Sequence, residues 1–167
     1  MGNKGSSTNS ASTNQTSTSN TGSSNKQAET VSIAKIGEEV VDSEIGFTAT
    51  DTQKAATLGN QYTKKTAQGQ FYIVTIKIEN KSKETKTIDS SMITLTDSQG
   101  RKFDRSIDGQ TAKGLAEGKV DLFLQQVQPG LNVTGDIVFD IPKDATGLKL
   151  NVKGGYFGKE KQIELGE

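Results

Sequence analysis

The chain of 167 residues carries 20 basic and 20 acidic side chains and has no histidine, cysteine or tryptophan. The absence of cysteine excludes disulfides and thiol chemistry. The absence of histidine removes the usual general base near neutral pH and the commonest transition-metal ligand. The charges are interspersed, so no basic stripe points to nucleic acid and no acidic tail points to a basic partner. We therefore expect no metal site, no cofactor and no nucleic-acid partner.

The first 30 residues are almost entirely Ser, Thr, Asn, Gly and Gln. Such a segment has too few apolar side chains to offset the entropy of ordering its backbone. We predict a disordered linker over residues 1–30 and one folded domain over residues 31–167. The linker is either a dispensable terminus or a spacer that holds the domain away from a surface.

Residues 2–7, Gly-Asn-Lys-Gly-Ser-Ser, are similar to the stretch that follows the lipidated cysteine of mature bacterial lipoproteins. The similarity implies that such a cysteine stands in the native protein where Met1 stands in this chain. It also implies an extracellular domain attached to the membrane through that lipid. No apolar run approaches the ~20 residues of a membrane span. The native gene sequence upstream of Gly2 tests this interpretation.

Alternation of apolar and polar residues, bounded by turn residues, is the main signal from residue 31 onward. Residues 31–41, interrupted near Gly37, and residues 45–50 predict the first strands. Residues 51–68 predict a long loop. The clearest strand follows at residues 69–80, where four apolar side chains share one face: Tyr72, Val74, Ile76 and Ile78.

The middle of the chain predicts a hairpin and a second long loop. Residues 92–96 and 101–103 flank Asp-Ser-Gln-Gly, a sequence typical of a tight turn. Residues 105–120 contain three glycines, so we expect either a single helical turn between Gln110 and Lys119 or a mobile loop. Together with residues 51–68, this segment is the expected recognition surface, and we expect both to be more mobile than the central strand.

The last third of the chain predicts further strands at residues 121–127, 131–141 and 148–152, and an edge strand at residues 163–165. The strongest, 131–141, follows a Pro-Gly turn and ends at Pro142. Its Gly135 indicates either a bulge or a close approach between sheets. Seven to nine short strands without a persuasive helix predict an all-β, immunoglobulin-like β-sandwich.

Three segments, in this order, resemble the DUF4352 family: residues 69–82, residues 93–103, and residues 127–150 with their Gln-Pro-Gly turn and Gly-Asp-Ile-Val-Phe-Asp-Ile-Pro strand. The resemblance covers residues 31–153. It implies the MPT63-like, immunoglobulin-like domain of bacterial surface lipoproteins, frequently from Gram-positive organisms. It implies no activity, because the family has no established catalytic residues, and the fold alone supplies none.

Exposed aromatic side chains are the expected ligand contacts, and we select Tyr62, Tyr156 and Phe157. The alternative for these three is packing at the ends of the sandwich. We predict a non-enzymatic module that binds a protein or a cell-wall ligand, with no catalytic residue.

Two other functions remain open. An extracellular hydrolase would need two close carboxylates in a deep pocket. A structural spacer would need no site. The acids that we expect near one end of the sandwich are Asp97, Asp104, Asp108, Glu117 and Asp121, which are either solvated loop residues, weak calcium ligands or the carboxylates of such an enzyme.

Overall fold

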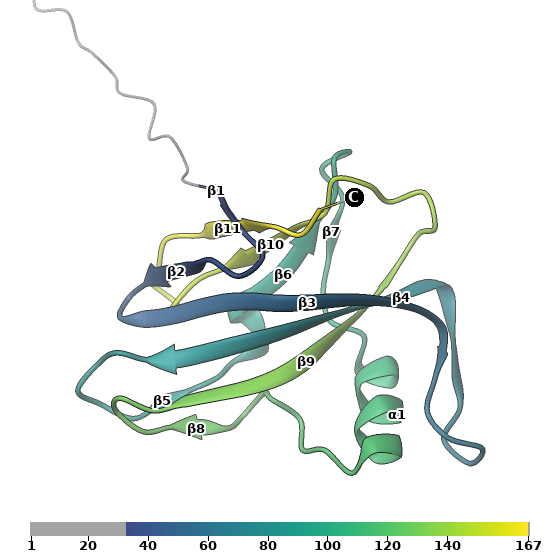
Figure 1. Ribbon diagram of the computed structural model, residues 1–167, viewed down its shortest axis with the longest axis horizontal. Coiled ribbons are helices and arrows are strands. Elements are labelled where there is room, and N and C mark those ends of the chain that lie inside the picture. The colour runs from purple at the N-terminus through teal and green to yellow at the C-terminus, as the bar shows by residue number, and fades with distance from the viewer. Residues whose placement is uncertain (1–32, 167) are drawn as a thin grey trace, which may run out of the picture. The chain divides into compact units, whose positions relative to one another are not determined.

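The structure, a computed structural model, describes residues 33–166, so the predicted linker over residues 1–30 and the predicted domain start at residue 31 lie outside the described residues (Figure 1). One sheet has the strand order β1 (Ile33–Lys35), β11 (Lys161–Glu164), β10 (Lys149–Val152), β6 (Ile93–Thr96) and β7 (Lys102–Phe103). The second sheet has the order β2 (Glu39–Asp42), β3 (Ile45–Leu58), β4 (Lys65–Asn80) and β9 (Asn132–Ile141).

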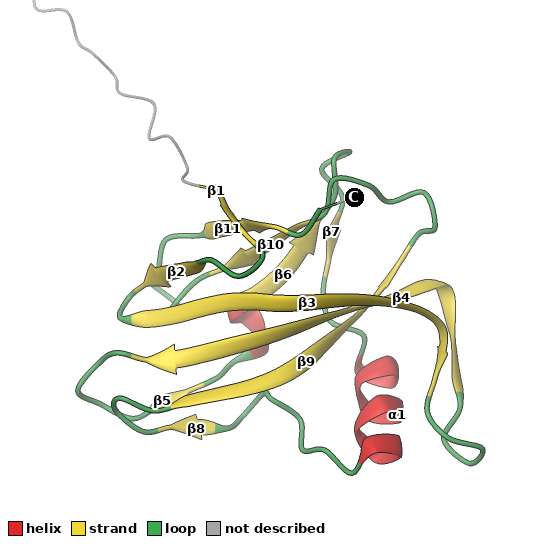
Figure 2. Cartoon of the chain, in the orientation of Figure 1, coloured by secondary structure: helices red, strands yellow, loops and turns green. Residues whose placement is uncertain are grey.

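Three small elements complete the described chain: a strand pair, β5 (Lys86–Thr87) with β8 (Gln126–Val127), a 3-10 helix, η1 (Ser90–Met92), and an α-helix, α1 (Ile107–Glu117) (Figure 2). The predicted immunoglobulin-like β-sandwich is confirmed. Of the eleven described strands, only the two-residue strand β5 lies in a segment that the alternation does not predict, and β1 and β2 both fall within the predicted segment 31–41.

The core lies between the two sheets and is built from the inward faces of alternating strands. The predicted inward face of β4 is confirmed, because Tyr72, Val74, Ile76 and Ile78 are all buried. Apolar side chains of β9, β6 and β10 complete it, among them Ile137, Phe139, Leu95 and Leu150.

The predicted interruption at Gly37 is where the chain moves from one sheet to the other. Gly37 has a φ of 88°, and Glu38 N–H donates to the Lys35 carbonyl across the turn, at 3.0 Å. β1 then pairs with β11, and β2 pairs with β3. The prediction of an edge strand near residue 163 is wrong, because β11 lies between β1 and β10.

The prediction of a loop over residues 51–68 is also wrong, because β3 and β4 form a hairpin that extends to the pair Leu58–Lys65. Its register shifts at Ala49/Asp51 and again at Ala55/Thr57. Each irregularity moves the side chains that follow to the opposite face, so the period-two pattern is lost in the sequence. Only residues 59–64 form the loop at the tip of the hairpin.

Helix α1 corrects the prediction of a loop over residues 105–120. The outer face of the second sheet buries a small apolar cluster of Phe71, Ile73 and Val138, and α1 covers it. The Ser106 side chain caps the first turn by accepting from Gly109 N–H, at 3.2 Å. Gly118 ends the helix in the left-handed conformation, with a φ of 64°. The glycines therefore do not prevent the helix from forming. Gly118 ends it, and Gly109 lies where it packs against the sheet.

Gly109 allows α1 to approach the sheet. A Cβ at this position would lie 2.8 Å from Phe71 Cε1 and 2.8 Å from Val138 Cγ1. Alanine is the better helix former by about 1 kcal/mol, so Gly109→Ala would be stabilising if the helix were free. We expect a net loss of about 1–3 kcal/mol in the free energy of unfolding, measured by urea denaturation, because the methyl group overpacks the contact.

Thr111→Ala, at an exposed position of the same helix, is the matched control, and we expect it to be neutral or slightly stabilising. Equal stabilisation by both substitutions would contradict the described packing of α1.

Between residues 121 and 127, the predicted strand is reduced to the two residues of β8. Leu122 and Phe123 are buried, but Leu124 is exposed and has a φ of 66°, which interrupts any ladder. Gly135 marks a close approach, since a Cβ there would lie 3.3 Å from Leu122, and the register of β4 with β9 does not shift at this residue.

Candidate functional site

The structure places the three predicted contact residues at the surface and divides them between two loops. Tyr62, in the β3–β4 loop, is 86% exposed, whereas Tyr156 and Phe157, in the β10–β11 loop, are 90% and 95% exposed. The two loops lie at opposite ends of the sandwich (Figure 1). The alternative of packing is therefore wrong for these side chains. Their role as ligand contacts stays a prediction.

Tyr156 and Phe157 form a pair. Their ring centroids are 5.1 Å apart and their planes meet at 86°, an edge-to-face contact. This geometry is favourable for aromatic rings, so the two side chains support one another although almost no other part of the protein covers them.

A buried carboxylate holds the loop that carries this pair. Asp42, the last residue of β2, is only 8% exposed. Its carboxylate oxygens accept from Gly154 N–H at 2.7 Å and from Lys159 N–H at 2.9 Å, so they bridge the two ends of the loop. The Ser43 hydroxyl donates to the same carboxylate, at 3.1 Å. We call residues 154–158 the clamped loop.

Two glycines make the clamp possible. A Cβ on Gly154 would lie 2.0 Å from the Asp42 carbonyl oxygen, and a Cβ on Gly158 would lie 2.2 Å from Asp42 Oδ2. Only a residue without a side chain can approach that closely. The sequence Gly-Gly-Tyr-Phe-Gly thus combines close contact at both ends with two exposed rings at the centre.

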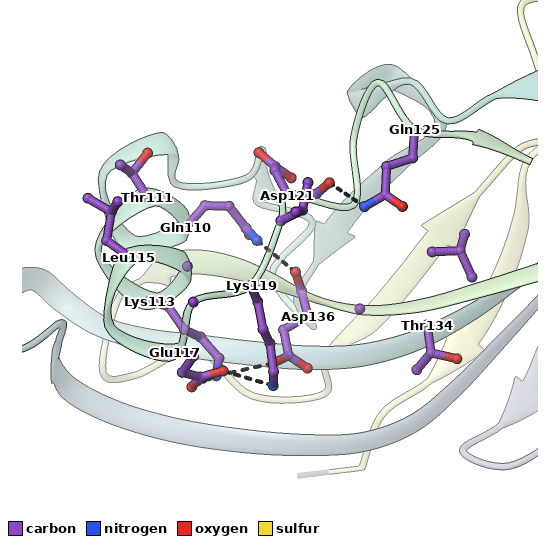
Figure 3. Close-up of a pocket in the computed structure, with 15 residues that line it drawn as sticks. Gln110, Thr111, Lys113, Leu115, Glu117, Lys119, Asp121, Gln125, Thr134 and Asp136 are labelled. Atoms are coloured by element: carbon purple, nitrogen blue, oxygen red, sulfur yellow. Dashed lines mark hydrogen bonds and ion pairs between the residues drawn. The ribbon is translucent and has the colours of Figure 1, made fainter.

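The second candidate is a groove of about 740 Å³ between α1, the segment after it, and β9 (Figure 3). Such a volume lies within the range of small-ligand sites. Four charged side chains gather on one wall: Lys113, Glu117, Lys119 and Asp136 (Figure 3). Lys113 bonds to Glu117 and lies 3.1 Å from Asp136, while Lys119 lies 2.8 Å from Glu117.

These four charged side chains form ion pairs with one another. Burial opposes ionisation of Asp136, but the Thr75 hydroxyl and Lys113 outweigh it and hold the pKa of this carboxyl below its ordinary value. Lys113 and Lys119 lower the pKa of Glu117, and Glu117, followed by Asp136, raises the pKa of Lys119. All three groups are therefore charged at neutral pH, and none of them is tuned for proton transfer there.

The five predicted acids do not form one carboxylate cluster. Glu117 and Asp121 line the groove, and Asp121 lies 2.7 Å from Arg105. Asp104 and Asp108 line a separate depression of about 400 Å³. Asp97 accepts from Arg101 at 2.7 Å in the β6–β7 turn, as its predicted turn role requires. Among residues 33–166, no three His, Cys, Asp or Glu side chains are arranged to hold a metal ion.

Sequence reasoning missed the groove because it missed α1. Two signals were available. Phe71 and Ile73 lie on the outer face of β4 and require a cover, and Ser106 stands where an N-cap residue stands, with Gly118 twelve residues later at the C-cap. The helices that the structure describes are too short and too polar to cross a bilayer.

Comparison with known proteins places the chain in a family. The profile of "Domain of unknown function (DUF4352)" matches residues 34–163. The uncharacterized protein YxkC of Bacillus subtilis is 34% identical over 124 residues, which cover 71% of this chain and 68% of YxkC.

Two crystal structures have the same fold at low sequence identity. The yjhA protein of Bacillus subtilis has a TM-score of 0.60 and 14% identity, covering 80% of this chain and 99% of yjhA. The secreted protein MPT63 of Mycobacterium tuberculosis has a TM-score of 0.57 and 15% identity, covering 81% and 96%. The profile match and the similarity to YxkC establish that the chain belongs to the DUF4352 family, the resemblance that its strands and turns predict.

Proposed function

We propose that this protein is a non-enzymatic, extracellular binding module that attaches to an anionic cell-wall polymer through the clamped loop. The observation that carries the proposal is the display of Tyr156 and Phe157, which are 90% and 95% exposed on a loop that Asp42 fixes at both ends. A fixed loop loses little conformational entropy on binding, and exposed aromatic rings supply contact area when they are covered.

The charges beside the rings favour an anionic partner. In the sequence, Lys153, Lys159 and Lys161 flank the clamped loop together with the acid Glu160. The carboxylate of Asp42 also lies against the loop, but it is buried and accepts from backbone N–H groups. Lysine stems can lie along apolar surface while their ammonium groups meet negative charge. A polymer with repeated phosphates or carboxylates and a sugar backbone offers both the charge and the ring faces that such a loop fits.

The proposal that the protein is not an enzyme is supported by the state of its acids. Glu117 and Asp136 are paired with lysines and have lowered pKa values, so neither of them is a neutral general acid at pH 7. A hydrolase that uses carboxylates needs one acid with a raised pKa beside an ionised one. The structural-spacer alternative does not account for a fixed loop that exposes two aromatic rings.

We also propose that the native protein is a lipoprotein. The Gly-Asn-Lys-Gly-Ser-Ser sequence at residues 2–7 supports this, as does the fold shared with a secreted mycobacterial protein. A native gene that encodes no hydrophobic leader and no cysteine before Gly2 would contradict it.

Sedimentation with purified Bacillus subtilis cell walls tests the function. We expect the full chain to pellet with the walls, and the double variant Tyr156→Ser/Phe157→Ser to bind at least about tenfold more weakly, because two covered aromatic side chains are lost. Binding should also weaken as salt is added, since the lysine contacts are screened.

Tyr62→Ser is the matched control, because it removes an equally exposed ring from the opposite end of the sandwich, and we expect it to bind as the unchanged chain does. Walls stripped of their anionic polymers should not retain the protein. If the unchanged chain stays in the supernatant, or if the double variant pellets equally well, the proposed function is wrong.

A further inference from the structure

Strand β9 is the last strand of its sheet, with β4 on one side only (Figure 2). An edge strand presents unpaired backbone N–H and C=O groups that can accept another strand, so proteins usually cover such edges. The outer edge of β9 is covered over part of its length only, and the uncovered part forms the floor of the groove beside α1.

Three hydrogen bonds show which residues of β9 face outward. Val138 N–H donates to Gln110 Oε1 at 3.0 Å, and Gln110 Nε2 donates to the Asp136 carbonyl at 2.8 Å. Ser106 N–H donates to the Val138 carbonyl at 2.7 Å. Because backbone groups alternate along a strand, the even-numbered residues from 132 to 140 turn their N–H and C=O away from β4.

The Gln110 side chain thus takes the place of a neighbouring strand at the Asp136 carbonyl and the Val138 N–H. The backbone of Ser106 does the same at the Val138 carbonyl. Beyond the Asp136 carbonyl this cover ends. The outward groups that follow are Asp136 N–H and the N–H and C=O of Thr134. No group within residues 33–166 hydrogen-bonds to these three. Thr134, Gly135 and Asp136 line the groove (Figure 3).

We propose that this groove binds an extended peptide segment, which adds to the open edge of β9 as a further strand. The peptide would donate one N–H to the Thr134 carbonyl and accept from Thr134 N–H and Asp136 N–H, the pattern of β-strand addition. The site is separate from the clamped loop, so this proposal does not depend on the wall-binding function.

The lining of the groove favours some peptide sequences over others. Leu115 and Val120 are exposed apolar side chains at its rim, so an apolar peptide residue facing α1 would cover them. The ion pairs of Lys113 and Lys119 with Glu117 and Asp136 leave the wall close to electrically neutral, which disfavours a strongly charged peptide.

A single peptide strand fits this edge better than a second copy of the domain does. In a second copy, the matching edge of β9 lies beside its own α1, so pairing of the two edges has to accommodate a second helix beside the first. A peptide without a covering helix has no such obstacle.

The variant Thr134→Pro tests the open edge of β9 without changing the pairing of β9 with β4. Thr134 N–H faces away from β4, so Thr134→Pro removes one donor to the peptide and no hydrogen bond within the sheet, a position where proline is tolerated in edge strands. Thr134→Val retains the N–H and has similar shape, and it is the matched control.

The probe is a phage-displayed library of random linear peptides, selected on the full chain, with the enriched sequences synthesised and titrated by calorimetry. We expect the peptides to bind Thr134→Pro about tenfold more weakly and Thr134→Val within about twofold, because one hydrogen bond is lost in the first variant only. Wall sedimentation should be the same for both variants, and Tyr156→Ser/Phe157→Ser should bind the peptides normally.

Amide hydrogen exchange provides a second readout that needs no variant. A bound peptide should protect the Thr134 and Asp136 amides of the unchanged chain. The proposal is overturned if no peptide is enriched, if peptides bind Thr134→Pro undiminished, or if those two amides stay unprotected. Dimerisation that Thr134→Pro abolishes would identify a second copy as the occupant and would equally overturn the peptide.

Discussion

Replacing Asn80 by aspartate is expected to destabilise the domain by about 4 kcal/mol at neutral pH, because it buries a charge without a counter-ion. Asn80 is 1% exposed and ends β4. Its Nδ2 donates to the carbonyls of Glu84 at 2.6 Å and Val127 at 2.8 Å, while its Oδ1 accepts from Ser82 N–H and from the Ser82 hydroxyl. Aspartate would direct a carboxylate oxygen at the two carbonyl oxygens.

The pH dependence of this loss distinguishes charge from shape. Burial beside two carbonyls raises the pKa of the new carboxyl in the folded state, so the penalty is present above that raised pKa and disappears below the unfolded value of about 3.9. The difference in free energy of unfolding between Asn80→Asp and the unchanged chain should therefore shrink as the pH falls from 7 toward 4.

Asn80→Ala is the control without charge, since it loses the two bonds that Nδ2 donates, as aspartate does, and also the two that Oδ1 accepts from Ser82. We expect it to cost about 2 kcal/mol, with a difference from the unchanged chain that does not vary with pH. Urea denaturation at several pH values measures all three proteins. A pH-independent loss for Asn80→Asp would show that its carboxylate is solvated, in contradiction to the described burial.

Removing the carboxylate of Asp42 is expected to release the clamped loop and to weaken wall binding. In Asp42→Ala, the N–H groups of Gly154 and Lys159 lose their acceptor, and we expect a loss of about 2–3 kcal/mol in the free energy of unfolding. The amides of those two residues should then exchange faster with solvent, because the carboxylate that accepts from both of them is gone.

Asp42→Asn retains the shape and one acceptor oxygen, so we expect an intermediate effect on both stability and exchange. In wall sedimentation, Asp42→Ala should bind more weakly than the unchanged chain although Tyr156 and Phe157 are intact, since a released loop loses more entropy on binding. Unchanged exchange at Gly154 and Lys159 would contradict the clamp.

The sandwich could be predicted because its strands alternate regularly where one face is buried and the other is solvated. The strands at Phe71–Glu79 and Leu131–Ile141 show this pattern except where α1 covers their outer face, at Phe71, Ile73 and Val138. The turn from Asp97 to Gly100 uses residues that stabilise turns locally. Such signals depend on neighbours within a few residues, so one sequence suffices to read them.

The groove and the clamp could not be predicted because each depends on contacts between distant residues. Gln110 meets the edge of β9 from 26 residues away, and Asp42 meets Gly154 from 112 residues away. The Gly-Gly-Tyr-Phe-Gly sequence of residues 154–158 is typical of a turn, but nothing in it points to a carboxylate on β2. Likewise, the bulges in β3 hide a strand that only its pairing with β4 reveals.

The most direct test of the central claim is a two-dimensional amide NMR spectrum of the full chain, recorded with and without solubilised cell-wall fragments. If the protein binds the wall polymer through the clamped loop, the shifts should be confined to residues 153–161 and to Asp42 and Ser43 beside them, with Thr134 and the β3–β4 loop unchanged. An unaltered spectrum, or shifts concentrated elsewhere on the sandwich, would contradict the claim.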